Sequence, residues 1–139
     1  MDISKYRKDF PLLNKEDSLI YLDSACMTLR PQEVIDSITE YYTDYPACGG
    51  RSLHKLSWQV TEKFEIARDS LRKFVGAEQS SEIVFTKNAT EGMNTVANGL
   101  RFKQGDHVLT SDKEHNANVV PWHHLSKYNG ISYDVLPPK

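Results

Sequence analysis

The chain has 139 residues, of which 39% are hydrophobic and 26% are charged, and its formal net charge is −2. These figures fit one soluble domain and exclude a disordered, collagen-like or coiled-coil chain. The near-neutral charge gives no electrostatic footprint for nucleic acid or anionic lipid, and no apolar run approaches the length of a membrane span.

The cysteine content and the N-terminus indicate a reduced, cytoplasmic protein. Cys26 and Cys48 are too few for a disulfide framework, and the first eight residues lack the apolar core of a signal peptide. Each cysteine is by default a small buried hydrophobe. The functional alternative is a pair of thiols near a pocket, able to accept sulfur or to bind a metal, although two ligands alone do not make a metal site.

The first residues predict an arm, a strand and a helix. Residues 3–8 form an amphipathic, basic arm, and residues 19–22 are a strand-like apolar run. Pro31 fits the first position of a helix, where its missing N–H costs nothing, and Pro46 ends the helical pattern.

A Gly-rich loop and a long helix follow. The loop covers residues 47–54 and is open to unusual backbone angles because of its glycines. The apolar stripe of the helix runs from Val60 to Phe74, and Gly76 stands where a helix C-cap is expected.

Residues 82–94 predict a strand that runs through a tight turn into a helix. Residues 83–85 form an apolar run typical of a buried strand, and a helical pattern begins at Ala89. Such a turn leaves the first helical N–H groups unpaired at the positive end of the helix dipole, which is a natural seat for a phosphate. Thr90 adds a hydroxyl there. The alternative is that Asn88 and Thr90 simply cap the helix.

The C-terminal third predicts two strands that flank a helix. The strands cover residues 107–111 and 131–136, and the helix between them ends at Asn129-Gly130. Helices that alternate with strands through short turns predict an α/β layered fold with a largely parallel sheet.

Short motifs along the chain resemble a known family. In chain order they are Phe10-Pro11-Leu12, Tyr21-Leu22-Asp23-Ser24-Ala25, Arg51-Ser52-Leu53-His54 with Ser57, Glu82-Ile83-Val84-Phe85-Thr86, Ala89-Thr90-Glu91 with Asn94, Gly105-Asp106, Glu114-His115 with Ala117-Asn118, and Val120-Pro121-Trp122. Together they resemble the N-terminal part of class V aminotransferase-fold enzymes that use pyridoxal 5′-phosphate. Within that class they look most like the SUF-type cysteine desulfurase and selenocysteine lyase branch, over essentially the whole chain.

The resemblance implies the first part of a fold-type I PLP-dependent transferase large domain, with a mostly parallel sheet flanked by helices and left incomplete in this chain. Residues 1–18 would be an arm that packs with a small domain missing here, and residues 19–139 the N-terminal portion of the PLP-binding domain. The implied activity removes sulfur or selenium from cysteine or selenocysteine, a small amino-acid substrate, and leaves alanine. A homodimer and a role in iron–sulfur cluster assembly are implied for the complete enzyme.

The resemblance also assigns roles around the cofactor. Ala89 and Thr90 match the phosphate-cradle turn, in agreement with the helix N-terminus argument. His115 matches the catalytic histidine that stacks on the ring of pyridoxal 5′-phosphate and shuttles protons. Its alternative role is a solvated histidine before a helix. No metal site is implied.

Three further residues match the substrate side of the family's pocket. Ala25 matches a loop that lines the pocket, although Cys26 and Met27 stand where the family has small or hydroxyl residues. Arg51 and His54 match a loop near the pocket mouth, where a cation and an imidazole meet a carboxylate substrate. Either residue is equally compatible with a plain surface role.

The family's remaining functional residues lie beyond this chain: the lysine that attaches the cofactor, the aspartate at the pyridine nitrogen, the sulfur-accepting cysteine and the carboxylate-binding arginine. Lys55, in Ser52-Leu53-His54-Lys55, imitates the family's Ser-x-His-Lys motif. It comes too early and precedes an amphipathic helix rather than a Gly-rich turn, so it is rejected as that lysine.

Two function classes therefore remain. The first is an enzyme part, a truncated or split desulfurase with a possible companion C-terminal chain, or another class V enzyme such as a transaminase or kynurenine-cleaving lyase. The second is a non-catalytic α/β fragment that binds a partner chain. In the family's sheet the strands that join its two sides lie in the missing part. We therefore predict that residues 108–110 pair with 133–135, that residues 82–86 do not pair with 107–111, and that the isolated chain is poorly stable or self-associated.

Overall fold

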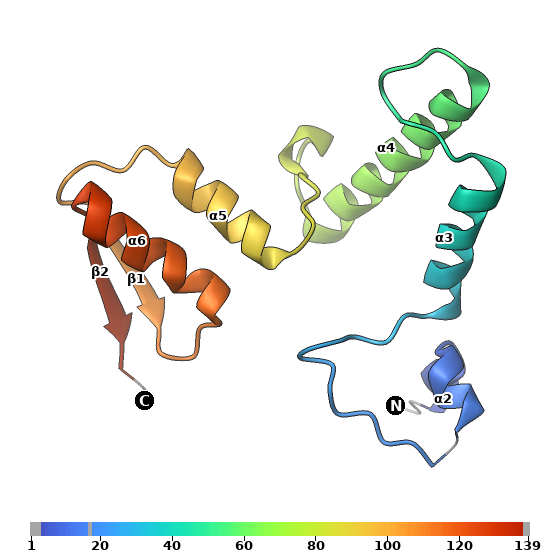
Figure 1. The fold of residues 1–139 in the computed structure, drawn as a ribbon, viewed down its shortest axis with the longest axis horizontal. Coiled ribbons are helices and arrows are strands. Elements are labelled where there is room, and N and C mark those ends of the chain that lie inside the picture. Colours follow the sequence, from blue (N-terminus) through green and yellow to red (C-terminus); the bar gives the residue numbers. More distant parts are fainter. Residues whose placement is uncertain (1–3, 17, 138–139) are drawn as a thin grey trace. The chain divides into compact units, whose positions relative to one another are not determined.

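The computed structural model describes residues 4–16 and 18–137 (Figure 1), and the chain divides into two compact units, Met1–Ile83 and Val84–Lys139. The N-terminal unit contains α1 (Ser4–Arg7), α2 (Pro11–Lys15), α3 (Gln32–Asp44), α4 (Lys55–Val75) and the 3-10 turn η1 (Ser80–Glu82). The C-terminal unit contains α5 (Ala89–Gly99), β1 (His107–Ser111), the 3-10 turn η2 (Asn116–Asn118), α6 (Val120–Asn129) and β2 (Ser132–Leu136).

Helices α3 and α4 agree with the sequence prediction to within a residue at Pro31, whereas α2 was not predicted. Pro31 lies at the N-cap of α3, and Tyr45, one residue before Pro46, is its C-cap. Helix α4 ends at Gly76, whose φ of 74° is left-handed, as a C-cap glycine requires. The predicted arm is helical over α1, and its first residue, Ile3, lies outside the described residues.

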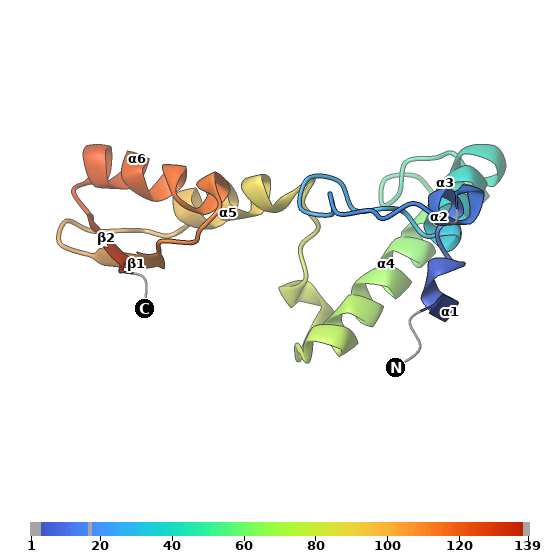
Figure 2. The ribbon, with the colours of Figure 1, turned by 90° about the horizontal axis from the view of Figure 1, so that it is seen from below.

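The C-terminal unit is built on a parallel strand pair joined through a helix. Strands β1 and β2 pair in parallel with Val108 opposite Tyr133 and Thr110 opposite Val135, so the predicted pairing is confirmed. The connection passes through α6, which lies over one face of the pair (Figure 2). Parallel strands need such a crossover because a tight hairpin cannot join them.

One hydrophobic core fills the space between these helices and the strands. Its buried members come from α5, from α6 and from the residue before β2, and partly buried side chains surround them. The buried residues are Ala97, Trp122, Leu125 and Ile131, and the partly buried ones are Met93, Phe102, Val108 and Tyr133. Because strand side chains alternate between faces, Leu109 lies on the opposite face of the pair, where it is 54% exposed. One face of the sheet is therefore covered, and the other is open.

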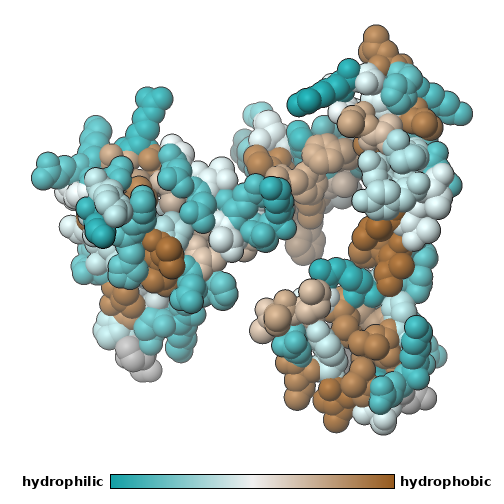
Figure 3. Space-filling model, viewed as in Figure 1, coloured by the Kyte–Doolittle hydropathy of each residue, from teal (hydrophilic) through white to brown (hydrophobic). Residues whose placement is uncertain are grey.

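Two predicted strands are not formed. Residues 19–22 and 83–85 have no strand structure, and the side chains of Leu22 and Val84 are 88% and 74% exposed. A strand needs a neighbouring backbone for its N–H and C=O groups, and the sheet of the described residues holds only β1 and β2. The prediction of a buried strand at 83–85 is therefore wrong for this chain, whereas the prediction that 82–86 does not pair with β1 is confirmed. Figure 3 shows apolar residues open on the surface.

The described residues include no helix that is long and apolar enough to cross a membrane. Within the same part of the chain, no three His, Cys, Asp or Glu side chains are grouped so that they can hold a metal ion.

Candidate functional site

The N-terminus of α5 has a cap that leaves two N–H groups open. Asn88 is the N-cap, as the sequence allowed, and its side-chain oxygen accepts from the Glu91 N–H at 2.9 Å. The Glu91 carboxylate turns back to accept from the Lys87 N–H at 2.5 Å. Among the described residues, the N–H groups of Ala89 and Thr90 have no acceptor. They are the first two donors of an eleven-residue helix, so capping and anion binding are compatible at this turn.

Thr90 differs from the other threonine of α5 in the use of its hydroxyl. The Thr95 hydroxyl donates to the Glu91 carbonyl at 2.8 Å. The Thr90 side chain is exposed and forms no hydrogen bond within the described part of the chain. One threonine is therefore committed to its own helix, and the other is available to a ligand.

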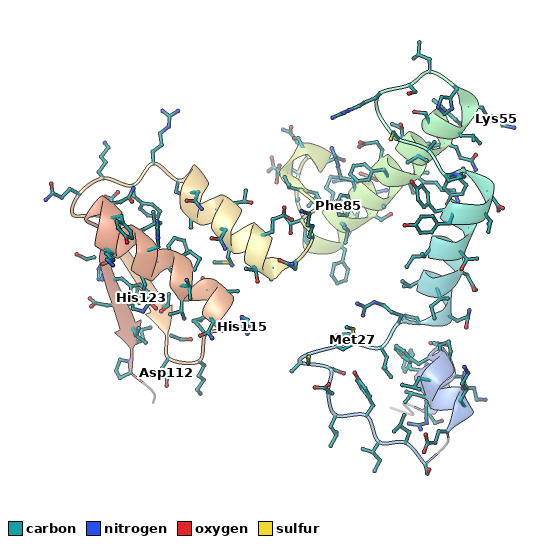
Figure 4. All side chains as sticks on the ribbon, viewed as in Figure 1. Met27, Lys55, Phe85, Asp112, His115 and His123 are labelled. Atoms are coloured by element: carbon teal, nitrogen blue, oxygen red, sulfur yellow. The ribbon has the colours of Figure 1, made fainter. Side chains whose placement is uncertain are left out.

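His115 lies on the loop that leads from β1 into α6 (Figure 4). Its Nδ1 accepts from the Ala117 N–H at 3.0 Å, so the imidazole is the N-cap of η2. A ring nitrogen that accepts carries no proton, and the neutral ring therefore holds its proton on Nε2. Nε2 has no partner among the described residues, and the side chain is exposed.

Glu114, the residue before His115, is held by two hydrogen bonds. Ser111 Oγ donates to Oε1 and Asn118 Nδ2 donates to Oε2, both at 2.8 Å. The bonds from Asn118 and Ser111 stabilise the ionised form and so hold the pKa of the Glu114 carboxyl below its usual range. The negative charge of Glu114 is thus stabilised by hydrogen-bond donors within the loop.

The loop that carries Arg51 and His54 is fastened to the first turns of α4. His54 is the N-cap of α4, and its Nδ1 accepts from the Ser57 N–H at 3.3 Å. The fully buried Ser57 hydroxyl donates to the Cys48 carbonyl at 2.6 Å. Thr61 Oγ1 accepts from the Gly50 N–H at 2.8 Å, and Gly50 has the left-handed φ of 73° that favours glycine.

Arg51 lies at the tip of this fastened loop. Its side chain is exposed and forms no hydrogen bond or ion pair with any described residue. An open cavity of about 340 Å³ lies beside the loop and is lined by Gly49, Gly50, Val60, Thr61, Phe64 and Glu65. Arg51 and His54 therefore lie on one loop that is held by hydrogen bonds, and both side chains are exposed.

Ala25 lies on a separate exposed turn of the N-terminal unit. The Asp23 carbonyl accepts from the N–H groups of Cys26 and Met27, at 3.1 and 2.9 Å. No hydrogen bond joins this turn to Arg51 or His54 within the described ranges. Both cysteines are exposed, so the interpretation of each as a small buried hydrophobe is wrong for this structure. Few elements surround them in a unit with so little core.

Lys55 is the first residue of α4 and follows the His54 cap (Figure 4). Its side chain is exposed on a continuous helix of 21 residues. Lys55 is therefore followed by a helix, as the sequence predicted, and not by a Gly-rich turn.

The structure gives a positioning role to four residues that the sequence analysis named only as parts of motifs, and to Thr61, which it did not name. They are Ser57 and Thr61, next to the loop of Arg51 and His54, and Glu114, Asn118 and Trp122, around His115. For Ser57 and Thr61 the spacing was a usable signal, because residues four apart lie on one face of a helix. Asn118 lies in η2 and Trp122 in α6, so helical spacing gave no such signal for them. Ala89, Thr90, His54 and His115 thus lie at capped helical starts, whereas Ala25 lies on a separate turn and Arg51 on the loop before α4.

Comparison with known proteins identifies the family of this chain. The profile of the aminotransferase class-V family matches residues 20–139. A cysteine desulfurase from Escherichia coli is 40% identical over 141 residues, which are 97% of this chain but 35% of that protein.

Solved structures give the same result for the fold. The apo structure of a cysteine desulfurase from Thermococcus onnurineus superposes with a TM-score of 0.88 at 37% identity, over all of this chain and 34% of that one. A C-DES mutant with glycine covalently linked to its PLP cofactor superposes with a TM-score of 0.75 at 25% identity, over 95% of this chain and 33% of that one. The chain thus spans about a third of the length of the relatives it matches.

Proposed function

This chain belongs to the aminotransferase class-V family, and from that premise we propose that it forms the N-terminal part of a PLP-dependent cysteine desulfurase. The proposed reaction removes sulfur or selenium from cysteine or selenocysteine and leaves alanine. The main support is the N-terminus of α5, where the N–H groups of Ala89 and Thr90 and the Thr90 hydroxyl have no hydrogen-bond partner among the described residues and can bind an anion. The 40% identity to a cysteine desulfurase favours this chemistry over the other class V reactions.

The residues at the start of α5 fit the phosphate of pyridoxal 5′-phosphate. Two unpartnered backbone donors, a free hydroxyl and the positive end of the helix dipole suit a dianionic group. The chemistry that this cofactor supplies when bound is electron withdrawal from the amino-acid substrate. Glu91 does not oppose the phosphate directly, because its carboxylate is already turned to the Lys87 N–H.

His115 has the features of a stacking and proton-transfer residue. Its Nδ1 is fixed by the Ala117 N–H, which sets the ring in one tautomer and leaves Nε2 as the atom that holds or moves a proton. We propose that Arg51 and His54 meet the carboxylate of the substrate, with Ala25 beside it. An exposed guanidinium on a fastened loop suits that recognition.

The complete activity needs a lysine, an aspartate and a sulfur-accepting cysteine that this chain does not provide. We propose that they come from the remaining two thirds of the relatives' length, on the same polypeptide or on a companion chain. A cytoplasmic homodimer that serves iron–sulfur cluster assembly is proposed for the complete protein. Residues 1–18 are proposed to pack with its small domain.

Replacing Thr90 tests the cradle. In the full-length protein, Thr90→Val is expected to raise the Kd for pyridoxal 5′-phosphate about 10-fold or more, because a hydrogen bond to a charged group is lost. Thr95→Val is the matched control, since its hydroxyl serves only the Glu91 carbonyl. Absorbance titration gives the Kd values.

A separate assay identifies the reaction: release of both sulfide and alanine from cysteine, in the presence of a reductant, is the result expected of a cysteine desulfurase. Equal Kd values for Thr90→Val and Thr95→Val would contradict the cradle. Alanine without sulfide, from an amino donor other than cysteine, would favour another class V chemistry.

A further inference from the structure

A chain of hydrogen bonds runs from the core of the C-terminal unit to the loop that carries His115. Trp122 is 7% exposed, packs edge-to-face on Phe102, and donates from Nε1 to Asn118 Oδ1 at 2.9 Å. The amide nitrogen of Asn118 donates in turn to Glu114 Oε2 at 2.8 Å. The other oxygen of Glu114 accepts from Ser111 at 2.8 Å.

These bonds fix both ends of the loop. Ser111 is the last residue of β1, and Asn118 is the last residue of η2. Glu114 joins them through its two oxygens, and His115 follows it directly. The Asn118 N–H also donates to the His115 carbonyl at 2.8 Å. These hydrogen bonds therefore hold the backbone on both sides of His115, and Trp122 connects them to the hydrophobic core.

The chemistry of Glu114 decides what kind of role it has. A carboxylate with both oxygens engaged by donors is poorly placed to take a proton from a substrate. Its ionised form is the one that these bonds stabilise. The charge therefore serves to hold the loop.

We propose that Glu114 and Asn118 are positioning residues for His115, tied to the core by Trp122. This inference rests on the proposed function only for the role of His115 in the reaction. The holding of the loop stands on the contacts alone.

A polarity swap at one bond tests the proposal. Asn118→Asp keeps an acceptor for Trp122 but replaces the amide donor with an oxygen that faces the Glu114 carboxylate, so an attraction becomes a repulsion. Glu114→Gln keeps the shape of the side chain and gives it a donor. The double variant Glu114→Gln with Asn118→Asp reverses the direction of the same bond and restores every partner.

Hydrogen exchange in the full-length protein, followed by mass spectrometry, gives a readout that does not depend on activity. In a peptide over residues 112–119, Asn118→Asp is expected to speed amide exchange about 10-fold, and the double variant to return it to within about twofold of the parent. A peptide over residues 90–99 of α5 is the internal control. Unchanged exchange in Asn118→Asp, or no recovery in the double variant, would overturn the proposal.

Turnover links the loop to His115. Asn118→Asp is expected to lower kcat for sulfide release about 10-fold with KM changed less than twofold, and to lower it no further in a His115→Ala background. An equal further loss in that background would show that Asn118 does not act through His115. If His115→Ala alone loses no activity, the proposed function fails at this residue, while the exchange result still decides whether the loop is held.

Discussion

At the scale of single residues, the two histidines that match the family share one arrangement. His54 and His115 each cap a helical turn through Nδ1, which accepts from the Ser57 and Ala117 N–H groups, respectively. Ser, Thr, Asp and Asn usually do this work. A histidine that does it is fixed in one tautomer and presents Nε2 outward. The same hydrogen bond thus caps the helical turn and orients the imidazole so that Nε2 can contact a ligand.

The two histidines are expected to differ in their kinetic effect. His115→Ala in the full-length protein should lower kcat for sulfide release about 100-fold or more, the usual scale of a positioned acid–base group. His54→Ala should act mainly on KM, because its proposed contact is with the substrate carboxylate. Steady-state sulfide release measures both, and an unchanged rate in His115→Ala would remove this residue from the mechanism.

No lysine of this chain is expected to be modified stoichiometrically by the cofactor. Covalent attachment needs an amine held against the aldehyde, and Lys55 lies exposed on the first turn of α4. Incubation of residues 1–139 with pyridoxal 5′-phosphate, borohydride reduction and peptide mass spectrometry should give only scattered, substoichiometric labels. One stoichiometrically labelled lysine would contradict this expectation.

At the scale of elements, the helices could be predicted from the sequence and two of the strands could not. A helix closes its hydrogen bonds within its own residues, so the stripe from Val60 to Phe74 and the cap at Gly76 were sufficient for α4. A strand depends on a neighbour. Residues 107–111 pair with β2, whereas residues 83–85 are wholly apolar but pair with no strand among the described residues. The role of Glu114 in holding the loop was likewise not predicted, because it depends on partners on two different elements.

Helix α4 should lose support in acid. Hydrogen bonds from Lys73 and Arg72 lower the pKa of Asp69 from 3.8 to about 2. Because the folded pKa is the lower one, this support is present above about pH 4 and is lost as the pH falls toward 2. Circular dichroism of a peptide over residues 52–79 should show a loss of helix content as the pH falls. The peptide with Asp69→Asn should not show this acid transition.

Glu62→Gln is the matched control for this titration, since Glu62 forms no ion pair with any described residue. An acid transition of equal size in the parent and Asp69→Asn peptides would show that Asp69 does not support the helix. Added salt should weaken the effect in the parent, because these pairs are exposed.

The C-cap of α4 should depend on glycine itself. At Gly76 and at Gly99 an added Cβ meets no atom within 4 Å, but only Gly76 has a positive φ, of 74°. Gly76→Ala should therefore destabilise the full-length protein by about 1 kcal/mol. Gly99→Ala, within a helix, should be neutral or stabilising by up to about 1 kcal/mol. Urea unfolding compares the two, and equal effects would contradict the backbone explanation.

At the scale of the whole molecule, this chain has more apolar surface than it can cover by itself. Large hydrophobic side chains are open in both units, among them Leu22, Phe74 and Val84, which are 88%, 86% and 74% exposed. The parallel pair of β1 and β2 offers backbone groups along both edges and has one uncovered face. Natural sheets protect such edges. The chain spans about a third of the length of its relatives.

The isolated chain is therefore expected to be marginally stable or self-associated. Exposed apolar segments and unpaired strand edges favour pairing with another chain, and the buried side chains of the C-terminal unit form only a small core. Sedimentation of residues 1–139 should show concentration-dependent oligomers, with a broad urea transition. Addition of the C-terminal two thirds as a separate polypeptide should give a defined complex with a sharp transition, because the open strands then gain neighbours. A monomer that unfolds cooperatively without that addition, and with residues 83–85 protected from hydrogen exchange, would show that the chain covers these surfaces by itself.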